Sequence, residues 1–237
     1  MIGFAVVATA VVIAALVQGA IGVGFALIVA PVAAIIRPEL LPGSILVLML
    51  PLNGYVAWRE RAHFDLRSTG WISVGRFVGT FAGVWILVVV TRPALDMIVG
   101  GTTILAAIAT KFAPRFAPTR TAYVGAGLVT GVTETSTGIG GPPLALVYQH
   151  HPAPALRSTI ALCFLLGELF SLLVLVLKGR AGLTQLGDAG LLLPPLALGL
   201  YFSGRVHKRL RAERLRDALL AFAVLSGLVL IVQSLAS

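Results

Sequence analysis

Charged residues are scarce in this sequence. Asp, Glu, Lys and Arg make up 11% of its 237 residues, whereas about a quarter of the residues in an ordinary soluble domain are charged. Such a chain cannot cover a water-exposed surface with polar groups, and 58% of its residues are hydrophobic. The composition therefore predicts an all-α integral membrane protein, a single domain over residues 1–237. It has room for about six to eight crossings of about 20 residues each.

Cysteine and the familiar catalytic motifs are also nearly absent. Cys163 is the only cysteine, which excludes a disulfide framework and a cysteine metal site. The chain has no Gly-x-x-x-x-Gly-Lys-Ser/Thr phosphate loop, no paired His–Glu zinc motif and no Gly-x-Ser-x-Gly nucleophile turn. His150 and His151 adjoin Pro152 and are expected in a surface loop, since two neighbouring histidines do not form a metal site alone. We expect no enzyme, no cofactor and no metal.

Acidic residues are half as numerous as basic ones. The chain has 18 Lys and Arg against 9 Asp and Glu, a net charge of +9. Interleaved aromatic and basic patches are missing, so nucleic acid is not expected as a partner. Cytoplasmic loops of membrane proteins retain Lys and Arg, which explains the excess. No basic residue precedes Arg37, so the first segment lacks the charged region of a cleavable signal and is expected to belong to the mature protein.

A polar interruption lies inside the apolar segment 122–148. Between Thr130 and Pro143 the sequence holds Glu134, a run of hydroxyl side chains, glycines and two prolines. A carboxylate inside a membrane is costly, so a functional site is the default interpretation. The alternative is a loop between two helices that never enters the lipid.

The first apolar segment, Ile2–Ile36, is interrupted in a similar way. It is too long for one ordinary span of about 20 residues, and its centre, from Gln18 to Gly24, is polar and rich in glycine. Glycine lets the backbone turn where a side chain would clash. We therefore expect two helical arms, at about 2–18 and 24–36, of which the second is shorter than the ~30 Å membrane core.

This plan occurs twice, in halves of about 1–113 and 120–237. Each half has one broken segment and then three whole apolar ones, expected near 43–58, 70–90, 94–112, 158–178, 187–206 and 215–235. Gly22-Val23-Gly24 matches Gly138-Ile139-Gly140, and Asn53 falls opposite Glu168. Internal repeats with broken helices at matching positions are the best sequence pointer to a transporter's binding site.

The positive charges distinguish two topologies. If each broken segment is a re-entrant hairpin, the chain crosses six times and 14 of the 18 basic residues share one side. These are Arg59, Arg61, Arg67, Arg76, Lys111, Arg115, Arg120, Arg157, Arg205, Lys208, Arg209, Arg211, Arg214 and Arg216. If all eight segments cross, each side holds 9. Only the hairpin topology satisfies the cytoplasmic excess of Lys and Arg. Each half then has three crossings, which makes the halves an inverted repeat.

The hairpin topology also places the connecting segments. Residues 59–69, 111–121, 149–157 and 205–216 are expected in the cytoplasm, and both termini outside. The basic run 205–216 would anchor this topology by facing anionic lipid. Apolar surfaces all round would allow a homodimer in the bilayer.

The two glycine motifs resemble those of the TauE/SafE sulfite-exporter family of anion transporters. They are Gly19-Ala-Ile-Gly22-Val-Gly24 and the stretch from Gly131 through Gly138-Ile-Gly140-Gly141-Pro142-Pro143. The resemblance covers essentially the whole chain. It implies a bacterial inner-membrane permease for sulfite, thiosulfate, organosulfonates or related sulfur compounds. The chain departs from a plainer pattern at Phe25, where a third glycine often stands, and in the polar run Thr133–Thr137, so the exact substrate stays open.

The broken segments are the expected substrate site. Glycines let an anion approach the bare N–H groups at a helix start, and the prolines suit the first turn of a helix beginning near Gly140. The two tips are expected to converge near the midplane from opposite sides. The expected substrate-binding residues are Gln18, Gly22, Gly24, Thr135, Ser136, Thr137, Gly138, Gly140 and Gly141. For any single glycine, tight helix packing is an equal alternative.

Four further residues are expected to couple or support transport. Glu134 would repel an anion unless it is protonated or paired; it either couples a proton to anion movement or is solvated near a rim. Asn53 and Glu168 form a candidate buried pair that supports the tips, binds a cation or simply joins two helices by a hydrogen bond. Arg76 lies near the cytoplasmic end of its segment, where snorkelling to the interface is the first interpretation and substrate capture the second.

The sequence therefore predicts a secondary permease for a small anion, embedded in the lipid bilayer. It would work by alternating access around a midplane site made by the two broken hairpins, with proton coupling as one option. The alternative is a non-transporting membrane scaffold or partner subunit, which would not require two inverted, broken, glycine-rich segments.

Overall fold

The computed structural model describes residues 2–112, 117–148, 151–206 and 212–235. It is 89% helical, and the described residues contain no strand, which confirms the all-α class. The helices are α1 (Ile2–Ile21), α2 (Phe25–Ile36), α3 (Gly43–Arg59), α4 (Leu66–Val89), α5 (Arg92–Phe112), α6 (Arg120–Thr137), α7 (Gly141–Tyr148), α8 (Ala153–Leu177), α9 (Leu183–Val206) and α10 (Ala212–Leu235), with short 3₁₀ turns η1 (Pro38–Leu40) and η2 (Arg61–His63). The two predicted interruptions separate α1 from α2 and α6 from α7.

Four of these helices are long and apolar enough to cross a membrane, which makes the chain a multi-pass membrane protein. They are α1, α4, α8 and Leu183–Arg205 of α9, judged by length and composition among the described residues. Six crossings were expected, with α1 as one arm of a broken segment, over about 2–18. The helix instead continues to Ile21, whereas the apolar stretches Pro93–Ala109 of α5 and Leu220–Leu235 of α10 are shorter than a span.

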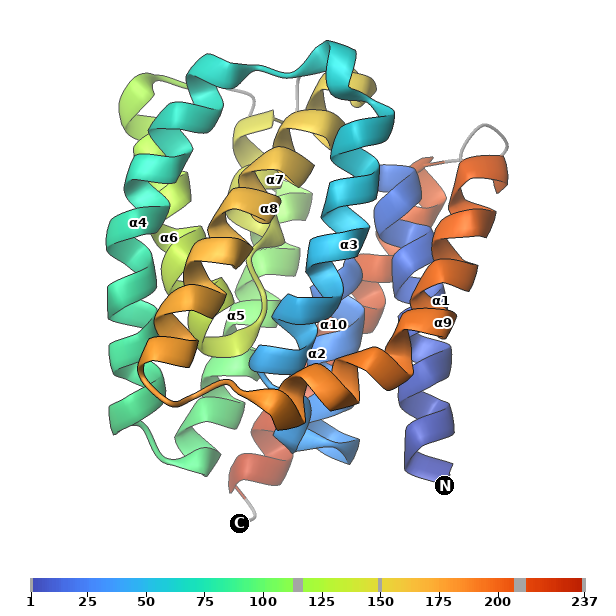
Figure 1. The fold of residues 1–237 in the computed structure, drawn as a ribbon, viewed down its shortest axis with the longest axis vertical. Helices are drawn as coiled ribbons and strands as arrows, with labels where there is room; N and C mark the ends of the chain where they lie inside the picture. The colour runs from blue at the N-terminus through green and yellow to red at the C-terminus, as the bar shows by residue number, and fades with distance from the viewer. Residues whose placement is uncertain (1, 113–116, 149–150, 207–211, 236–237) are drawn as a thin grey trace.

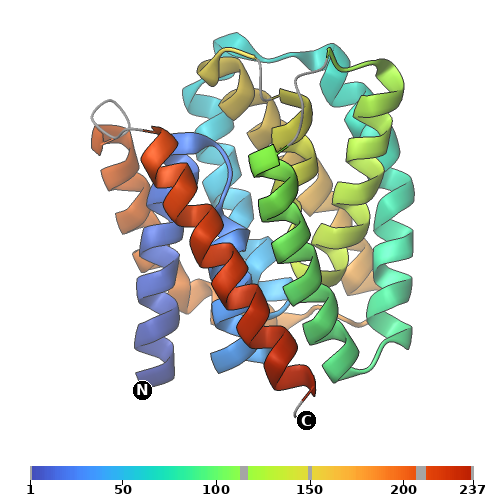
Figure 2. The same ribbon diagram turned by 180° about the vertical axis from the view of Figure 1, so that it is seen from behind.

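Successive helices alternate in direction along the chain (Figure 1). The most extensive contacts join helices that are not neighbours in sequence, namely α4 with α6, α1 with α9, α5 with α10 and α3 with α8. The start of α1 and the end of α10 lie at one end of the bundle, and α2 returns to that end (Figure 2). The link from α3 to α4, the end of α7 and the start of α8 lie at the other end. The six-crossing topology requires all the cytoplasmic connectors to lie at one end of the bundle, and these described segments do. Which end faces the cytoplasm stays a prediction.

Parts of three predicted cytoplasmic connectors lie outside the described residues. These parts are residues 113–116, 149–150 and 207–211. They include His150 and four of the basic residues used to predict the topology, Arg115, Lys208, Arg209 and Arg211. The prediction that 111–121 and 149–157 share one face of the membrane therefore depends on the helix ends beside them.

Large apolar side chains point outward as well as inward. Trp85, Leu173 and Leu225 are 66%, 55% and 65% exposed. Contiguous apolar surface of this kind is avoided in water and suits contact with lipid. The short helix α2 differs, because most of its residues are buried and it packs against α1, α5 and α10. A helix too short to cross a bilayer is therefore enclosed by protein.

Helices α4 and α6 pack backbone against backbone. Glycines at intervals of four residues line both sides of this contact, Gly75, Gly79 and Gly83 on α4 and Gly127 and Gly131 on α6. A Cβ atom on Gly79 would overlap the carbonyl of Leu128, and one on Gly127 would overlap the carbonyl of Ile72. Small residues at this spacing let helices in a membrane approach closely. The contact brings the polar side chains of the two helices within reach of each other.

Substitution of Gly79 by Ala should push α4 and α6 apart. The added methyl group meets backbone atoms that cannot rotate away, so we expect a loss of about 1–3 kcal/mol in the free energy of unfolding. Gly70→Ala is the matched control, because Gly70 lies on the same helix and a Cβ there meets nothing within 4 Å. Thermal unfolding of both variants in detergent measures the difference. Equal unfolding temperatures would contradict the close packing.

Candidate functional site

Glycine makes both helix breaks. Gly22 and Gly24 have φ angles of 97° and 125°, and Gly138 has a φ of 81°. Residues with a side chain rarely adopt these conformations, so a bend at these positions requires glycine. Beyond the second break, α7 starts at Gly141 with Pro142 in its first turn, where no N–H is needed. The start of α7 lies where the second glycine motif predicted it.

Gln18 and Glu134 occupy equivalent places before the two breaks. The N–H of Gly22 donates to the carbonyl of Gln18 at 2.7 Å, and the N–H of Gly138 donates to the carbonyl of Glu134 at 2.7 Å. Each polar side chain thus leaves the last turn of a helix, four residues before a glycine. Sequence reasoning named both residues without pairing them, although the common spacing carried the signal.

The two breaks lie against each other inside the protein. A Cβ built on Gly141 would lie 3.7 Å from Cβ of Val23, the middle residue of the first break. The starts of α2 and α7 therefore meet, as the convergence of the two tips required. The first N–H of α2 already has a partner, because Phe25 N–H donates to Oε1 of Gln18 at 2.9 Å. Gln18 was expected to offer its amide to an anion and instead holds its own helix break closed.

A chain of buried amides leads from the first break to α8. Nε2 of Gln18 donates to Oδ1 of Asn53 at 3.0 Å, and Nδ2 of Asn53 donates to Oε1 of Glu168 at 2.7 Å. All three side chains are at most 2% exposed. The predicted contact between Asn53 and Glu168 is thus present. It joins α3 of the first half to α8 of the second.

The second break carries a buried ion pair. Nη2 of Arg76, on α4, pairs with Oε2 of Glu134, and the two side chains are 2% and 0% exposed. Nη1 of Arg76 donates to the backbone carbonyl of Cys163 at 2.9 Å. Snorkelling of Arg76 to the interface, the first interpretation from sequence, is wrong, because the side chain turns inward to a carboxylate. The option of a solvated Glu134 near a rim is wrong for the same reason.

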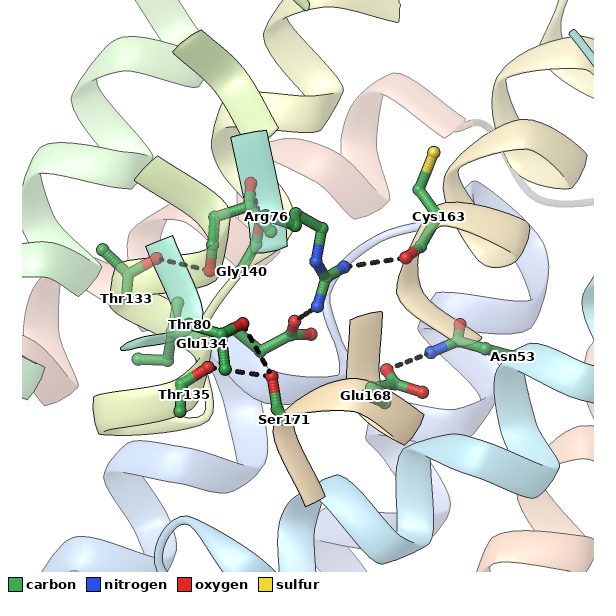
Figure 3. A network of polar contacts seen from close by, with 12 residues as sticks. Asn53, Arg76, Thr80, Thr133, Glu134, Thr135, Gly140, Cys163, Glu168 and Ser171 are labelled. Carbon is green, nitrogen blue, oxygen red and sulfur yellow. Dashed lines mark hydrogen bonds and ion pairs between the residues drawn. The ribbon is translucent and has the colours of Figure 1, made fainter. Parts of the chain in front are cut away.

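Glu168 is the second carboxyl beside this guanidinium. Figure 3 shows Arg76 between Glu134 on one side and the Asn53–Glu168 pair on the other. Glu168 acts electrostatically on Arg76, and its Oε2 atom has no hydrogen-bond partner. The two chains of polar contacts, one from each break, therefore end at the same cationic group. Neither hydropathy nor motif spacing predicted this meeting point.

The hydroxyl groups after Glu134 are already used within the protein. Ser136 donates to the carbonyl of Val132 at 2.8 Å, and Thr137 donates to that of Thr133 at 2.7 Å. Since a hydroxyl has one hydrogen, neither has a donor left for an anion, contrary to expectation. The Thr135 hydroxyl lies 2.8 Å from that of Ser171, which is also 3.4 Å from the hydroxyl of Thr80. Sequence reasoning missed these two partners on α8 and α4.

The glycines at the second break leave room for Glu134. A Cβ on Gly140 would lie 2.9 Å from Cβ of Glu134 and 3.1 Å from its carboxyl carbon. The carbonyl of Gly140 accepts a hydrogen bond from Thr130 at 3.1 Å. The break and the carboxyl group are therefore in direct contact, so movement of one disturbs the other.

A partly buried ion cluster covers the first break at the end of the bundle where α3 finishes. Nε of Arg157 donates to both Glu60 oxygens, at 2.8 and 3.0 Å, and Arg59 pairs with Glu60 at 3.0 Å. Arg59 also donates to the carbonyl of Gly19 at 2.7 Å. A Cβ on Gly22 would lie 2.7 Å from Cγ of Arg157. This cluster closes the bundle over the polar interior.

Substitution of Arg76 by Gln should strongly destabilise the protein. It leaves the buried carboxylate of Glu134 without its partner, and the loss of one member of a buried ion pair costs about 3–5 kcal/mol. Unfolding in detergent, followed by circular dichroism, measures this loss. Arg61→Gln is the matched control, since Arg61 is exposed and its guanidinium donates to the Trp58 carbonyl at 3.2 Å.

The double variant Arg76→Gln, Glu134→Gln tests the cause. It removes both charges, so it should recover most of the stability lost in Arg76→Gln, because a neutral pair leaves no uncompensated charge. A double variant as unstable as Arg76→Gln would contradict the ion pair as the reason.

Among the described residues, no group of three His, Cys, Asp or Glu side chains is placed to hold a metal ion.

Comparisons with known proteins add one finding to this geometry. Neither the curated proteins nor the solved structures contain a match to this chain. A family profile described as "Sulfite exporter TauE/SafE" matches residues 7–230. The match leaves only a few residues uncovered at either end, and the chain therefore belongs to the TauE/SafE sulfite exporter family of membrane transporters.

Proposed function

We propose that this chain is a secondary permease for a small anion, in particular sulfite, an organosulfonate or a related sulfur oxyanion. The observation that carries the proposal is the meeting of two broken helices beside the buried guanidinium of Arg76. Helix starts and guanidinium groups both bind oxyanions. A buried charge in a membrane protein is costly, and such residues mark substrate or ion pathways. Membership of a sulfite exporter family supports the substrate class.

Two related halves, about 1–113 and 120–237, would provide the alternating states. If the helices of each half are matched in order, from α1 with α6 to α5 with α10, then a pair of helices that packs together corresponds to another pair that also packs. α1 packs on α9 as α6 packs on α4, and α4 packs on α8 as α9 packs on α3. α2 packs on α10 as α7 packs on α5. These exchanges support an inverted repeat, whose two halves rock against each other around a site at their interface.

Six crossings of the bacterial inner membrane, with both termini on the periplasmic side, complete the proposal. The first and last helices begin and finish at one end of the bundle (Figure 2), and most basic residues belong to connectors at the other. At 1.5 Å per residue, Glu134 lies about 21 Å along α6 from Arg120, well inside a ~30 Å hydrocarbon core. An anion can then reach this depth only if the protein changes conformation.

Uptake by liposomes tests the permease. Purified protein should carry labelled sulfite, thiosulfate or methanesulfonate down an imposed gradient, with saturation at high concentration. The double variant Arg76→Gln, Glu134→Gln should give no more uptake than empty liposomes, because the cationic group is gone. A folded wild-type protein that moves none of these anions would favour the non-transporting scaffold or partner subunit.

Alternating access further predicts that the ion cluster of Arg59, Glu60 and Arg157 acts as a gate. Glu60→Gln weakens the pairs that close this end, so Cys163, 1% exposed and beside Arg76, should react several-fold faster with a membrane-impermeant thiol reagent. The reagent is added to the cytoplasmic face of oriented vesicles, and modification is followed by mass spectrometry.

Glu39→Gln is the control for this gate. Glu39 lies in η1, which directly follows α2, and it pairs with Arg37. Since α2 finishes at the opposite end of the bundle (Figure 2), this substitution should leave the reaction of Cys163 unchanged. Equal rates in the two variants would contradict the gate.

A further inference from the structure

We propose that Arg76 is the group that binds the transported anion. The Glu134 carboxylate pairs with Arg76 in the absence of the anion and is displaced when an anion and a proton arrive together. The site then takes monovalent oxyanions with two oxygens free to bind side by side, such as hydrogen sulfite or a sulfonate. This inference rests on the proposed function, because only a protein that moves an anion has a use for an exchangeable carboxylate here.

The guanidinium of Arg76 is only partly used by the protein. Nη1 donates to the Cys163 carbonyl, and Nη2 pairs with Oε2 of Glu134. Nε has no hydrogen-bond partner although the side chain is 2% exposed, and Oε1 of Glu134 has none either. Nε–H and one Nη–H of a guanidinium point in parallel and match two oxygens of an oxyanion. Glu134 therefore fills half of a two-point site.

Space for a ligand exists beside this guanidinium. A cavity of about 160 Å³ between α4 and α8 is lined by Ser73, Arg76, Phe77, Leu166, Gly167 and Phe170. The rings of Phe77 and Phe170 stack with their centroids 4.7 Å apart. A Cβ on Gly167 would overlap the guanidinium, so glycine at this position lets Arg76 reach the cavity. The apolar walls suit the organic part of a sulfonate while its charged end meets Arg76.

The charges around Glu134 set the stoichiometry. One cation, Arg76 of α4, faces two carboxyl groups, Glu134 of α6 and Glu168 of α8 (Figure 3). α5 and α7 pack beside α6 with uncharged residues such as Thr102 and Pro142, which line a pocket with Thr133 of α6. With all three groups ionised the enclosed cluster has a net charge of −1, and one proton, placed on Glu168, makes it neutral while Glu134 stays ionised beside Arg76. An unbalanced buried charge is costly, so the cluster should have no net charge both before and after an anion binds.

The exchange conserves charge if each anion arrives with one proton. The proton binds a carboxylate oxygen of Glu134, the pair with Arg76 separates, and two anion oxygens accept hydrogen bonds from Nε and Nη2. Glu168 and the thiol of Cys163 keep their hydrogen bonds to Asn53 and Thr69. A monovalent anion leaves the site neutral, whereas divalent sulfate would leave one negative charge uncompensated. The site should therefore discriminate by charge among similar oxyanions.

Liposomes that contain wild-type protein and a trapped pH dye test this exchange. Methanesulfonate is the first probe, because its charge does not change across the pH range of the assay, unlike that of sulfite. We expect methanesulfonate influx to be accompanied by about one proton per anion and to accelerate several-fold as the external pH falls from 8 to 6. Sulfate should be transported at least ten-fold more slowly than methanesulfonate or sulfite.

Substitutions of Glu134 identify the proton carrier. Glu134→Gln should still show an anion-dependent rise in unfolding temperature with methanesulfonate, because Arg76 remains. The pH dependence and the proton influx should be lost, because Glu168 already holds its proton and accepts no second one. Glu134→Asp keeps an acid and should retain both. Asp217→Asn removes an exposed carboxylate that pairs with Lys111 at 2.6 Å and should behave as wild type. If Glu134→Gln folds poorly, two other variants test the inference. Glu134→Asp should keep the coupling, and the double variant Arg76→Gln, Glu134→Gln should show no anion-dependent stabilisation.

The outcomes separate this inference from the proposed function. A wild-type protein that moves none of methanesulfonate, sulfite and sulfate contradicts both. Anion transport without proton influx, or Glu134→Gln with undiminished coupling, overturns the exchange and leaves the permease intact. Coupling lost in Glu168→Gln but kept in Glu134→Gln would assign the proton to Glu168 and also overturn it.

Discussion

The ion pair between Arg76 and Glu134 is the contact on which the rest of the site depends. A guanidinium inside an apolar bundle is tolerated only if charge and hydrogen-bonding groups surround it. Here they come from two helices: the carboxylate of Glu134 from α6 and the carbonyl of Cys163 from α8. This arrangement depends on glycine in two places. The glycine contact lets α4 and α6 approach closely, and the absence of a side chain at Gly167 leaves room for the guanidinium. Glycines that looked like packing devices are thus also requirements of the site.

The two halves build the same backbone device with different chemistry. Before the first break a neutral amide, Gln18, bonds to the neutral amide of Asn53. At the equivalent place before the second break the carboxylate of Glu134 pairs with Arg76. The pairs of packed helices therefore match between the two parts of the chain, whereas an ion pair is present beside only one of the two breaks. A single charged site of this kind is consistent with one anion handled at a time, while the neutral amides hold the other break.

A buried polar chain connects the two breaks. It runs from the backbone of Phe25 through Gln18 and Asn53 to Glu168, which acts electrostatically on Arg76. Each link is a contact inside a low-dielectric interior, where hydrogen bonds are strong and unmet groups are costly. Any rearrangement at the ion pair therefore changes the surroundings of Glu168 and, through it, the amides that hold the first break.

Much of the fold and part of the site followed from sequence. The scarcity of charge, the long apolar runs and the two glycine clusters predicted a helical membrane protein with breaks at Gly22–Gly24 and Gly138–Gly140. The family resemblance was also correct. These features are local, because composition selects the solvent and glycine alone permits the backbone bend. The contact between Asn53 and Glu168 was expected from their matching positions in the two halves of the sequence, and the structure contains it.

The tertiary structure alone decided what the polar side chains do. The sequence could not distinguish an Arg76 that snorkels from one that turns inward, because the choice depends on whether another helix presents a carboxylate at the same height. It could not show that Gln18 and the hydroxyls of Ser136 and Thr137 are already hydrogen-bonded within the protein. Composition and spacing determine which groups enter the membrane. Only the packing of helices distant in the chain decides which of those groups meet, since each buried donor or charge takes the partner that tertiary geometry places within reach.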